Sequence, residues 1–190
     1  MTASNISTTK KKRKISWEAF QAKYLTKEDN YKYEWVDGYV EKTRRARDDK
    51  QLFLLENLFA FFDIIKAKNN IDGRLISEVD TFFAGKHHRP DIAFFTRQQI
   101  RDARTGNNKI PPQFVIEVIS NTDQINRVQR KMQNYLKAKV KVVWHIFPEL
   151  KMVHVYTGKK MLICKDADIC SADSVIKGFK ISVDDIFKES

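Results

Sequence analysis

The sequence has few cysteines and no long hydrophobic run, and both facts narrow the class of protein. Cys164 and Cys170 are the two cysteines among 190 residues, and their spacing, with no histidine beside them, does not fit a zinc site. We expect a reduced pair in a cytoplasmic protein. The longest hydrophobic stretch, 52–65, is interrupted by Glu56 and Asp63, so no segment reaches the ~20 residues that cross a bilayer.

The sequence also lacks a signal peptide and a metal-binding pattern of histidines. The N-terminus is charged but lacks the hydrophobic segment of a signal peptide. The four histidines lack the spacing of metal ligands, and we expect all of them to be structural or exposed; they are His87, His88, His145 and His154. The sequence therefore predicts neither a membrane protein nor a histidine-based metal site.

Positive charge is in clear excess. The chain has 35 basic and 24 acidic residues, a net charge of +11, and residues 10–14 form one basic block. We predict a disordered basic tail over 1–14, because like charges repel and cannot be buried there, and a single domain over 15–190. The excess outside the block still favours a polyanionic partner, with nucleic acid ahead of an anionic membrane. A merely soluble basic protein is the alternative.

Helical and strand patterns alternate along the rest of the chain. The predicted elements are a helix over 17–25, a hairpin around Asp37-Gly38, a long helix over 49–68, strands over 74–83 and 90–95, a polar loop over 97–110, a buried strand over 114–119, a helix over 123–138, strands over 141–147 and 152–156, and short strands with a small helix over 160–190. This order indicates an α/β fold: a mixed β-sheet flanked by helices, with an N-terminal helix and hairpin and a C-terminal β extension.

Two carboxylates occupy unusual places in this pattern. Asp91 opens a strand directly after Pro90, and Glu117 lies inside the hydrophobic run 114–119. A carboxylate in a central strand costs several kcal/mol unless it is paired or binds a metal. Glu117 in a buried ion pair, and Asp91 as a turn or cap residue, are the alternatives. Taken together on consecutive strands, the two acids suit Mg²⁺.

The helix after Glu117 supplies the positive charge that such a site needs. No acidic residue occurs from Gln124 to Pro148. Lys131 lies on the flank of the predicted hydrophobic stripe, from which it can lean toward the sheet. A phosphate-contacting face and a solvated basic face are both consistent with this helix. The candidate nucleic-acid contacts are Arg127, Arg130, Lys131 and Lys137.

These residues resemble a known family. Pro90-Asp91, followed by Glu117 in Val-Ile-Glu-Val-Ile-Ser, resembles the PD-(D/E)XK motif of restriction-endonuclease-like nucleases. The wider set resembles the Uma-type branch, a widespread bacterial family of endonuclease-like proteins. The matching segments, in family order, are 15–20, 33–38, 89–94, 112–120, 131–136, 142–144 and 178–179.

The resemblance implies a restriction-endonuclease-like fold and a Mg²⁺- or Mn²⁺-dependent endonuclease that hydrolyses DNA. Asp91 and Glu117 would bind the metal together with the backbone carbonyl of Val118. Lys131 is similar to the family's catalytic lysine, and Glu34 would add a carboxylate. Cleavage of both DNA strands would suit a homodimer. The alternative is an inactive nucleic-acid-binding or regulatory module on the same fold.

Overall fold

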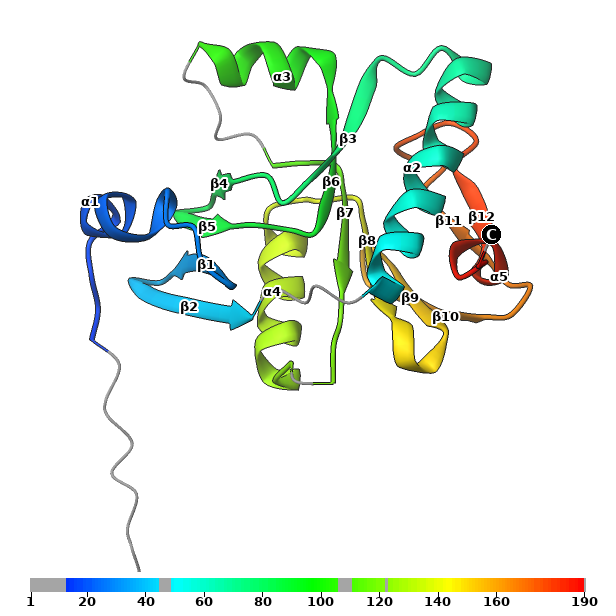
Figure 1. Ribbon diagram of the computed structural model, residues 1–190. Coiled ribbons are helices and arrows are strands. Elements are labelled where there is room, and N and C mark those ends of the chain that lie inside the picture. Colours follow the sequence, from blue (N-terminus) through cyan, green and yellow to red (C-terminus); the bar gives the residue numbers. More distant parts are fainter. Residues whose placement is uncertain (1–12, 45–48, 106–110, 122, 190) are drawn as a thin grey trace, which may run out of the picture.

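The computed structural model describes residues 13–44, 49–105, 111–121 and 123–189, and Figure 1 shows their arrangement. All but the last two residues of the predicted tail over 1–14 lie outside these ranges. Within the described residues, no helix combines the length and the hydrophobicity that crossing a bilayer requires. Cys164 and Cys170 are buried, free thiols.

A six-stranded mixed sheet forms the centre of the molecule. Its order is β10-β9-β8-β7-β6-β3. Only the central pair β7 and β8 is parallel, and every other pair is antiparallel. The parallel pair is hydrophobic almost throughout, as expected of strands that are covered on both faces. The strands are β3 (Gly73–Ser77), β6 (Ile92–Thr96), β7 (Phe114–Val118), β8 (Val142–Phe147), β9 (Met152–Thr157) and β10 (Lys160–Lys165).

One face of this sheet carries the larger hydrophobic core. It is covered by the long helix α2 (Asp49–Asn69) and by the C-terminal extension (Figure 1). The extension consists of β11 (Ile169–Ser171), β12 (Lys180–Ser182) and α5 (Val183–Ile186). The fully or almost fully buried members of this core include Leu54, Leu58, Phe62, Phe114, Trp144, Phe179 and Ile186.

The opposite face is covered by α4 (Ile125–Lys137) and by a second sheet. Val115 and Val143 of the six-stranded sheet pack with Met132 and Tyr135 of α4 in a smaller hydrophobic core. The second sheet has the order β2-β1-β5-β4. Its strands are β1 (Tyr31–Val36), β2 (Tyr39–Arg44), β4 (Thr81–Phe83) and β5 (Lys86–His88).

The predicted Asp37-Gly38 hairpin is confirmed as β1 and β2. Both turn residues have positive φ, 53° and 86°, which is the requirement of a tight two-residue turn. Strand alternation then divides β1 into two faces. Trp35 packs against Trp17 at the N-terminus, whereas Lys32 and Glu34 are buried on the other face.

The N-terminal helix is short and changes type. α1 (Trp17–Phe20) begins at Ser16, whose hydroxyl accepts a hydrogen bond from the N–H of Ala19. It continues as one turn of π-helix, η1 (Gln21–Leu25). The predicted helix over 17–25 is therefore confirmed in extent, and it covers the aromatic face of the hairpin.

The predictions for the segment 74–110 were wrong in three details. The strand predicted over 74–83 is two strands, β3 and β4, which belong to different sheets. Glu78, with φ 47°, lies at the bend between them. The segment left without an element between the predicted strands 74–83 and 90–95 contains strand β5. The loop predicted over 97–110 begins with helix α3 (Arg97–Arg104), which Thr96 and Gln99 stabilise through a capping box.

Strands β8 and β9 are connected by a single 3-10 turn, η2 (Pro148–Leu150).

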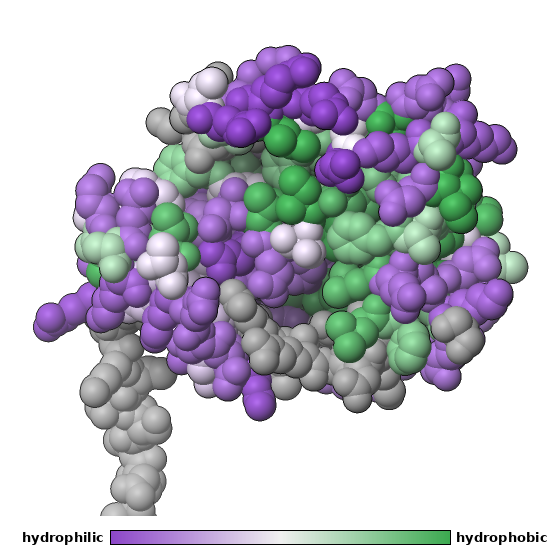
Figure 2. All heavy atoms as spheres, turned by 45° about the horizontal axis from the view of Figure 1, so that its top comes forward, coloured by the Kyte–Doolittle hydropathy of each residue, from purple (hydrophilic) through white to green (hydrophobic). Residues whose placement is uncertain are grey.

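Some hydrophobic side chains are exposed, most strongly Leu52 and Ile64 of α2, each at 65%. On the face seen in Figure 2, hydrophobic residues gather over the middle with hydrophilic residues around them.

Candidate active site

Asp91 and Glu117 lie close together at one end of two neighbouring strands. Glu117 belongs to β7, and Asp91 is the residue just before β6. The register pairs Ile92 with Ile116 and Ala93 with Val115, and continuing it by one residue beyond the start of β6 places Asp91 opposite Glu117. Directly opposite residues of an antiparallel pair project to the same side, with Cβ atoms about 5 Å apart. Both side chains line one cavity of about 250 Å³. The structure therefore brings the two acids together, as the sequence predicted.

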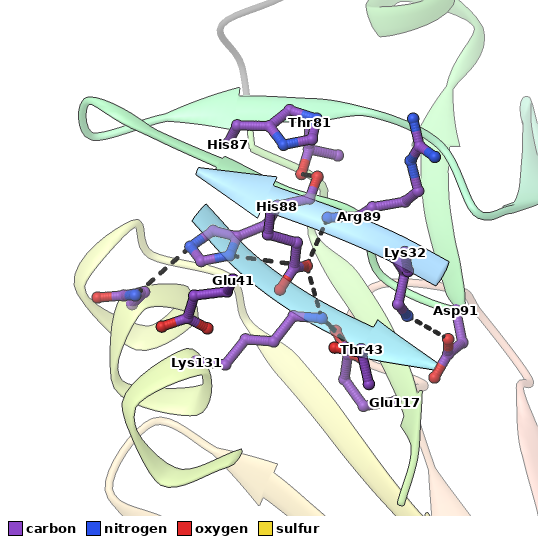
Figure 3. A network of polar contacts seen from close by, with 12 residues as sticks. Lys32, Glu41, Thr43, Thr81, His87, His88, Arg89, Asp91, Glu117 and Lys131 are labelled. Carbon is purple, nitrogen blue, oxygen red and sulfur yellow. Dashed lines mark hydrogen bonds and ion pairs between the residues drawn. The ribbon is translucent and has the colours of Figure 1, made fainter. Parts of the chain in front are cut away.

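Both oxygens of Asp91 have hydrogen-bond donors. The backbone N–H of Val118 donates to Oδ2 at 2.7 Å, and the ammonium group of Lys32 donates to Oδ1 at 2.6 Å (Figure 3). The first bond holds the carboxylate against the end of β7, one residue beyond Glu117. The second comes from β1, on the facing sheet, and was absent from the sequence prediction.

Lys131 reaches the same cluster from α4. Its ammonium group lies 2.8 Å from Oε1 of Glu34 and 2.8 Å from Oε1 of Glu117. The hydroxyl of Tyr135 also donates to Oε1 of Glu117, at 2.6 Å. Figure 3 shows Lys131 extending from the helix toward Glu117. The predicted flank position of Lys131 is therefore the one that lets it lean toward the sheet.

Glu34 is fully buried at the centre of this network. Its Oε1 accepts a hydrogen bond from the backbone N–H of Arg89 at 2.7 Å and contacts Lys131. Its Oε2 has no hydrogen-bond partner among the described residues, and the guanidinium of Arg127 lies 3.8 Å from it. Alternation in β1 turns Glu34 and Lys32 to the same side, which explains why both enter the cluster.

The charges of the cluster are compensated within it. Three carboxylates, Glu34, Asp91 and Glu117, face two ammonium groups, those of Lys32 and Lys131. Arg127 adds a third cation, 3.8 Å from Glu34. The fourth carboxylate nearby, that of Glu41, pairs with Arg127 at 2.9 Å and with Arg130 at 3.8 Å.

The pKa values of the cluster reflect burial opposed by charge. Burial raises the pKa of Glu34, but Lys131, His88 and Lys32 lower it by more, and the net pKa lies below the usual value. For Glu117 burial dominates, and its pKa is raised although Lys131 opposes the shift. Burial lowers the pKa of Lys32, but the surrounding carboxylates, Asp91 first, raise it above its usual value.

The predicted nucleic-acid contacts on α4 fall into two groups. Arg127 turns inward: its side chain is 18% exposed and bonds to Glu41 and to Thr43. Arg130 is 70% exposed, and Lys137 is exposed at the end of the helix. The structure therefore places Lys131 and Arg127 inside the cluster and leaves Arg130 and Lys137 on the surface.

Two residues of the cavity were missed by the sequence analysis. Lys32 could have been found, because it lies two positions before Glu34 in the same predicted strand. His145 is aligned with Glu117 across the parallel pair β7 and β8 and lines the cavity. It is 1% exposed, and its Nδ1 has no hydrogen-bond partner among the described residues. No local pattern connects it with Glu117, 28 residues earlier in the chain.

The donor atoms of the cavity fit a divalent cation. Asp91 and Glu117 offer hard carboxylate oxygens, and Val118 belongs to the same wall. Mg²⁺ is commonly held by one or two carboxylates, with water and phosphate oxygens completing its shell. Among the described residues no group of three or more His, Cys, Asp or Glu side chains is arranged around a common metal position. A site here would therefore rely on two carboxylates, with water and phosphate oxygens supplying the other ligands.

Comparison with known proteins agrees with the fold. The structure superimposes on the crystal structure of "a putative nuclease belonging to DUF820" from Anabaena variabilis with a TM-score of 0.70 and 20% sequence identity, covering 82% of this chain and 89% of that one. The restriction-endonuclease-like fold class is thereby confirmed. No curated protein matches the chain. Residues 17–184 match the family Uma2, described as "Putative restriction endonuclease", and the chain belongs to this family.

Proposed function

We propose that this protein is a Mg²⁺-dependent endonuclease that hydrolyses phosphodiester bonds in DNA. The observation that carries the proposal is the meeting of Asp91, just before β6, and Glu117 of β7 in one cavity, with the ammonium group of Lys131 2.8 Å from Glu117. Membership of a family described as restriction endonucleases supports the same reaction class.

Each side chain has a role that follows from its contacts. Asp91 and Glu117, with the backbone carbonyl of Val118, would hold Mg²⁺ or Mn²⁺. When bound, such a cation lowers the pKa of water and neutralises charge on the scissile phosphate. Lys131 would stabilise the negative charge that develops on the phosphate. Glu34 accepts a hydrogen bond from Arg89 and contacts Lys131, so it positions the lysine.

DNA as the substrate is supported by charge. The net charge of +11 favours a polyanion, and Arg130 and Lys137 are exposed on α4, the helix that carries Lys131. Their side chains can contact the backbone phosphates on either side of the scissile bond. Such an enzyme would act on DNA in the bacterial cytoplasm.

The direct test is plasmid nicking in Mg²⁺ and in Mn²⁺. We expect Asp91→Asn, Glu117→Gln and Lys131→Met each to slow cleavage by about a hundredfold or more, because each removes a metal ligand or the phosphate-stabilising charge. Binding of a short duplex, measured by fluorescence anisotropy, should remain in all three.

The matched control is Asp102→Asn, which removes a carboxylate from the exposed part of α3. It should cleave as the wild type does. Equal cleavage by the wild type and the three site variants would exclude this active site.

A second function is favoured by one observation: the carboxylates of Asp91 and Glu117 are already paired with lysines. A nucleic-acid-binding or regulatory module with the same fold would have no need of a metal site. Its carboxylates could stay in ion pairs with the lysines. It predicts no cleavage in either metal. A binding module would still bind DNA with strong dependence on salt, whereas a regulatory module would not.

Cleavage of both strands would need two sites. The described residues contain one set of Asp91, Glu117 and Lys131, so we extend the proposal to a homodimer with one site for each strand. Light scattering on the free protein and on its complex with a duplex tests this. A monomer in both states that still linearises plasmid in a single binding event would contradict it.

A further inference from the structure

We propose that Lys32 is a tethered cation that shields Asp91, and that it has to withdraw before this carboxylate can bind a divalent cation. The phosphate backbone of the substrate would attract the ammonium group of Lys32 away from Asp91. This inference rests on the proposed function, because it describes how the same site is controlled.

The contact geometry gives the first argument. Lys32 Nζ lies 2.6 Å from Asp91 Oδ1, and Val118 N lies 2.7 Å from Oδ2. Neither oxygen is left without a donor. Mg²⁺ binds carboxylate oxygens at about 2.1 Å, so a cation on Oδ1 would lie within a few ångströms of the ammonium group. Two positive charges at that separation repel strongly where little water screens them.

The placement of Lys32 gives the second argument. Its side chain is 9% exposed, and a buried lysine is retained only where acids compensate its charge. The two lysines of the cluster divide the carboxylates between them: Lys32 contacts Asp91, whereas Lys131 contacts Glu34 and Glu117. Lys131 can therefore stay in place while Lys32 moves.

The cavity gives the third argument. Lys32, Asp91 and Lys131 line the same 250 Å³ space, so a phosphate group that enters it meets the ammonium group of Lys32. A lysine binds phosphate as a point charge on a flexible stem. Its transfer from Asp91 to a phosphate oxygen would keep its charge compensated and free Oδ1. Phosphate binding and metal binding would then each strengthen the other, as linkage requires.

Calorimetric titration of the whole protein with Mn²⁺ tests the shielding. Lys32→Met keeps the hydrophobic stem and removes the charge, and we expect it to bind Mn²⁺ about tenfold more tightly than the wild type. Lys32→Arg retains the positive charge and should bind as the wild type does. Lys160→Met, which removes an exposed charge from the distant edge strand β10, is the matched control and should also be unchanged. Equal or weaker binding by Lys32→Met overturns the proposal.

Thermal unfolding provides a second readout. Without its lysine, Asp91 is left with an uncompensated charge, so Lys32→Met should have a lower Tm than the wild type. Mn²⁺ should then raise its Tm by more than it raises that of the wild type, because a ligand stabilises in proportion to its affinity. An equal or smaller rise contradicts the shielding.

The coupling to substrate is tested with a duplex that carries non-cleavable phosphorothioate linkages. The duplex should tighten Mn²⁺ binding by a larger factor in the wild type than in Lys32→Met, which has no shield to displace. An equal factor in both overturns the coupling.

Asp91→Asn separates this inference from the proposed function. If Asp91→Asn abolishes Mn²⁺ binding while Lys32→Met leaves the affinity unchanged, the metal site stands and the shielding is wrong. If Asp91→Asn binds Mn²⁺ as the wild type does, the metal site itself is wrong, and both proposals fall.

Discussion

At the scale of single residues, the cluster is held together by hydrogen bonds to charged groups in a buried setting. Tyr135 is one example: its ring is fully buried, and its hydroxyl donates to Glu117 at 2.6 Å. A hydrogen bond to a buried charge contributes more to stability than one between neutral groups. The tyrosine therefore stabilises the fold and orients the carboxylate at once.

We predict that Tyr135→Phe lowers the free energy of unfolding by about 2 kcal/mol. The phenyl ring keeps its packing, so the loss reports the hydroxyl alone, and urea unfolding at neutral pH measures it. Tyr156→Phe is the control, because the Tyr156 hydroxyl contacts only uncharged groups, His154 at 3.4 Å and Gln129. A loss for Tyr135→Phe no greater than that of the control would show that the bond to Glu117 contributes little.

Two buried histidines make stability depend on pH. Burial lowers the pKa of His88 to about 4 and that of His145 to about 4, whereas both have a pKa near 6.5 in the unfolded chain. Between these values the unfolded chain binds more protons. The stabilisation is therefore complete above about pH 6.5 and is lost as the pH falls toward 4.

We expect each histidine to reduce the free energy of unfolding by about 2 kcal/mol when the pH is lowered from 7.5 to about 5. Urea unfolding across this range measures the sum. His145→Phe removes one titrating group and should remove about half of the histidine contribution. A pH profile that is unchanged by this substitution would mean that His145 is protonated equally in the folded and unfolded states.

At the scale of elements, the hairpin of β1 and β2 decides the composition of the site. It brings Lys32 and Glu34 to the carboxylates of Asp91, just before β6, and of Glu117 in β7, and its turn fixes their register. Gly38 has a φ of 86°, a value that glycine adopts without steric cost. The hairpin therefore depends on this residue's backbone.

Substitutions at two glycines separate backbone strain from crowding. Gly38→Ala should lower the free energy of unfolding by about 1 kcal/mol, since the new Cβ would be no closer than 3.4 Å to Lys14. Gly73→Ala, at the start of β3, should cost about 2 to 3 kcal/mol, because its Cβ would lie 2.4 Å from the Phe94 ring. Denaturant unfolding of both variants gives the comparison.

Gly85→Ala is the reference for strain alone. Gly85 has a φ of 70°, and nothing lies within 4 Å of the added Cβ. Its loss should match that of Gly38→Ala. If Gly73→Ala were the mildest of the three, the close packing of β3 against Phe94 would be wrong.

At the scale of the whole molecule, the proposed function implies that positive charge governs the encounter with DNA. Proteins that neutralise phosphates release counterions, so their affinity falls with salt concentration in proportion to the number of contacts. Because Lys131 and Arg127 point inward, Arg130 and Lys137 are the exposed basic residues of α4, and we propose them as the sequence-independent contacts of that helix.

We predict that Arg130→Ala and Lys137→Ala each reduce the slope of log affinity against log salt by about 1. Fluorescence anisotropy with a labelled duplex, between about 50 and 200 mM salt, measures the slope. Lys160→Ala, at the far edge of the six-stranded sheet, should leave it unchanged. Three equal slopes would place the DNA on another face.

The sequence by itself determined the local parts of this protein. The hydrophobic run 114–119 specifies a buried strand, Asp37-Gly38 specifies a tight turn, and the two isolated carboxylates mark the site. These features follow from backbone conformation and alternation within a few residues, and both are encoded locally. The division into a tail over 1–14 and one domain over 15–190 stays a prediction.

Only the tertiary structure decided which charges meet. Lys32 and Asp91 are 59 residues apart in the chain, and Arg127 and Glu41 are 86 apart. The split of 74–83 into strands of two sheets was equally inaccessible, since each half is an acceptable strand. Contacts of this kind depend on how two sheets and a helix pack together, and no local pattern records that packing.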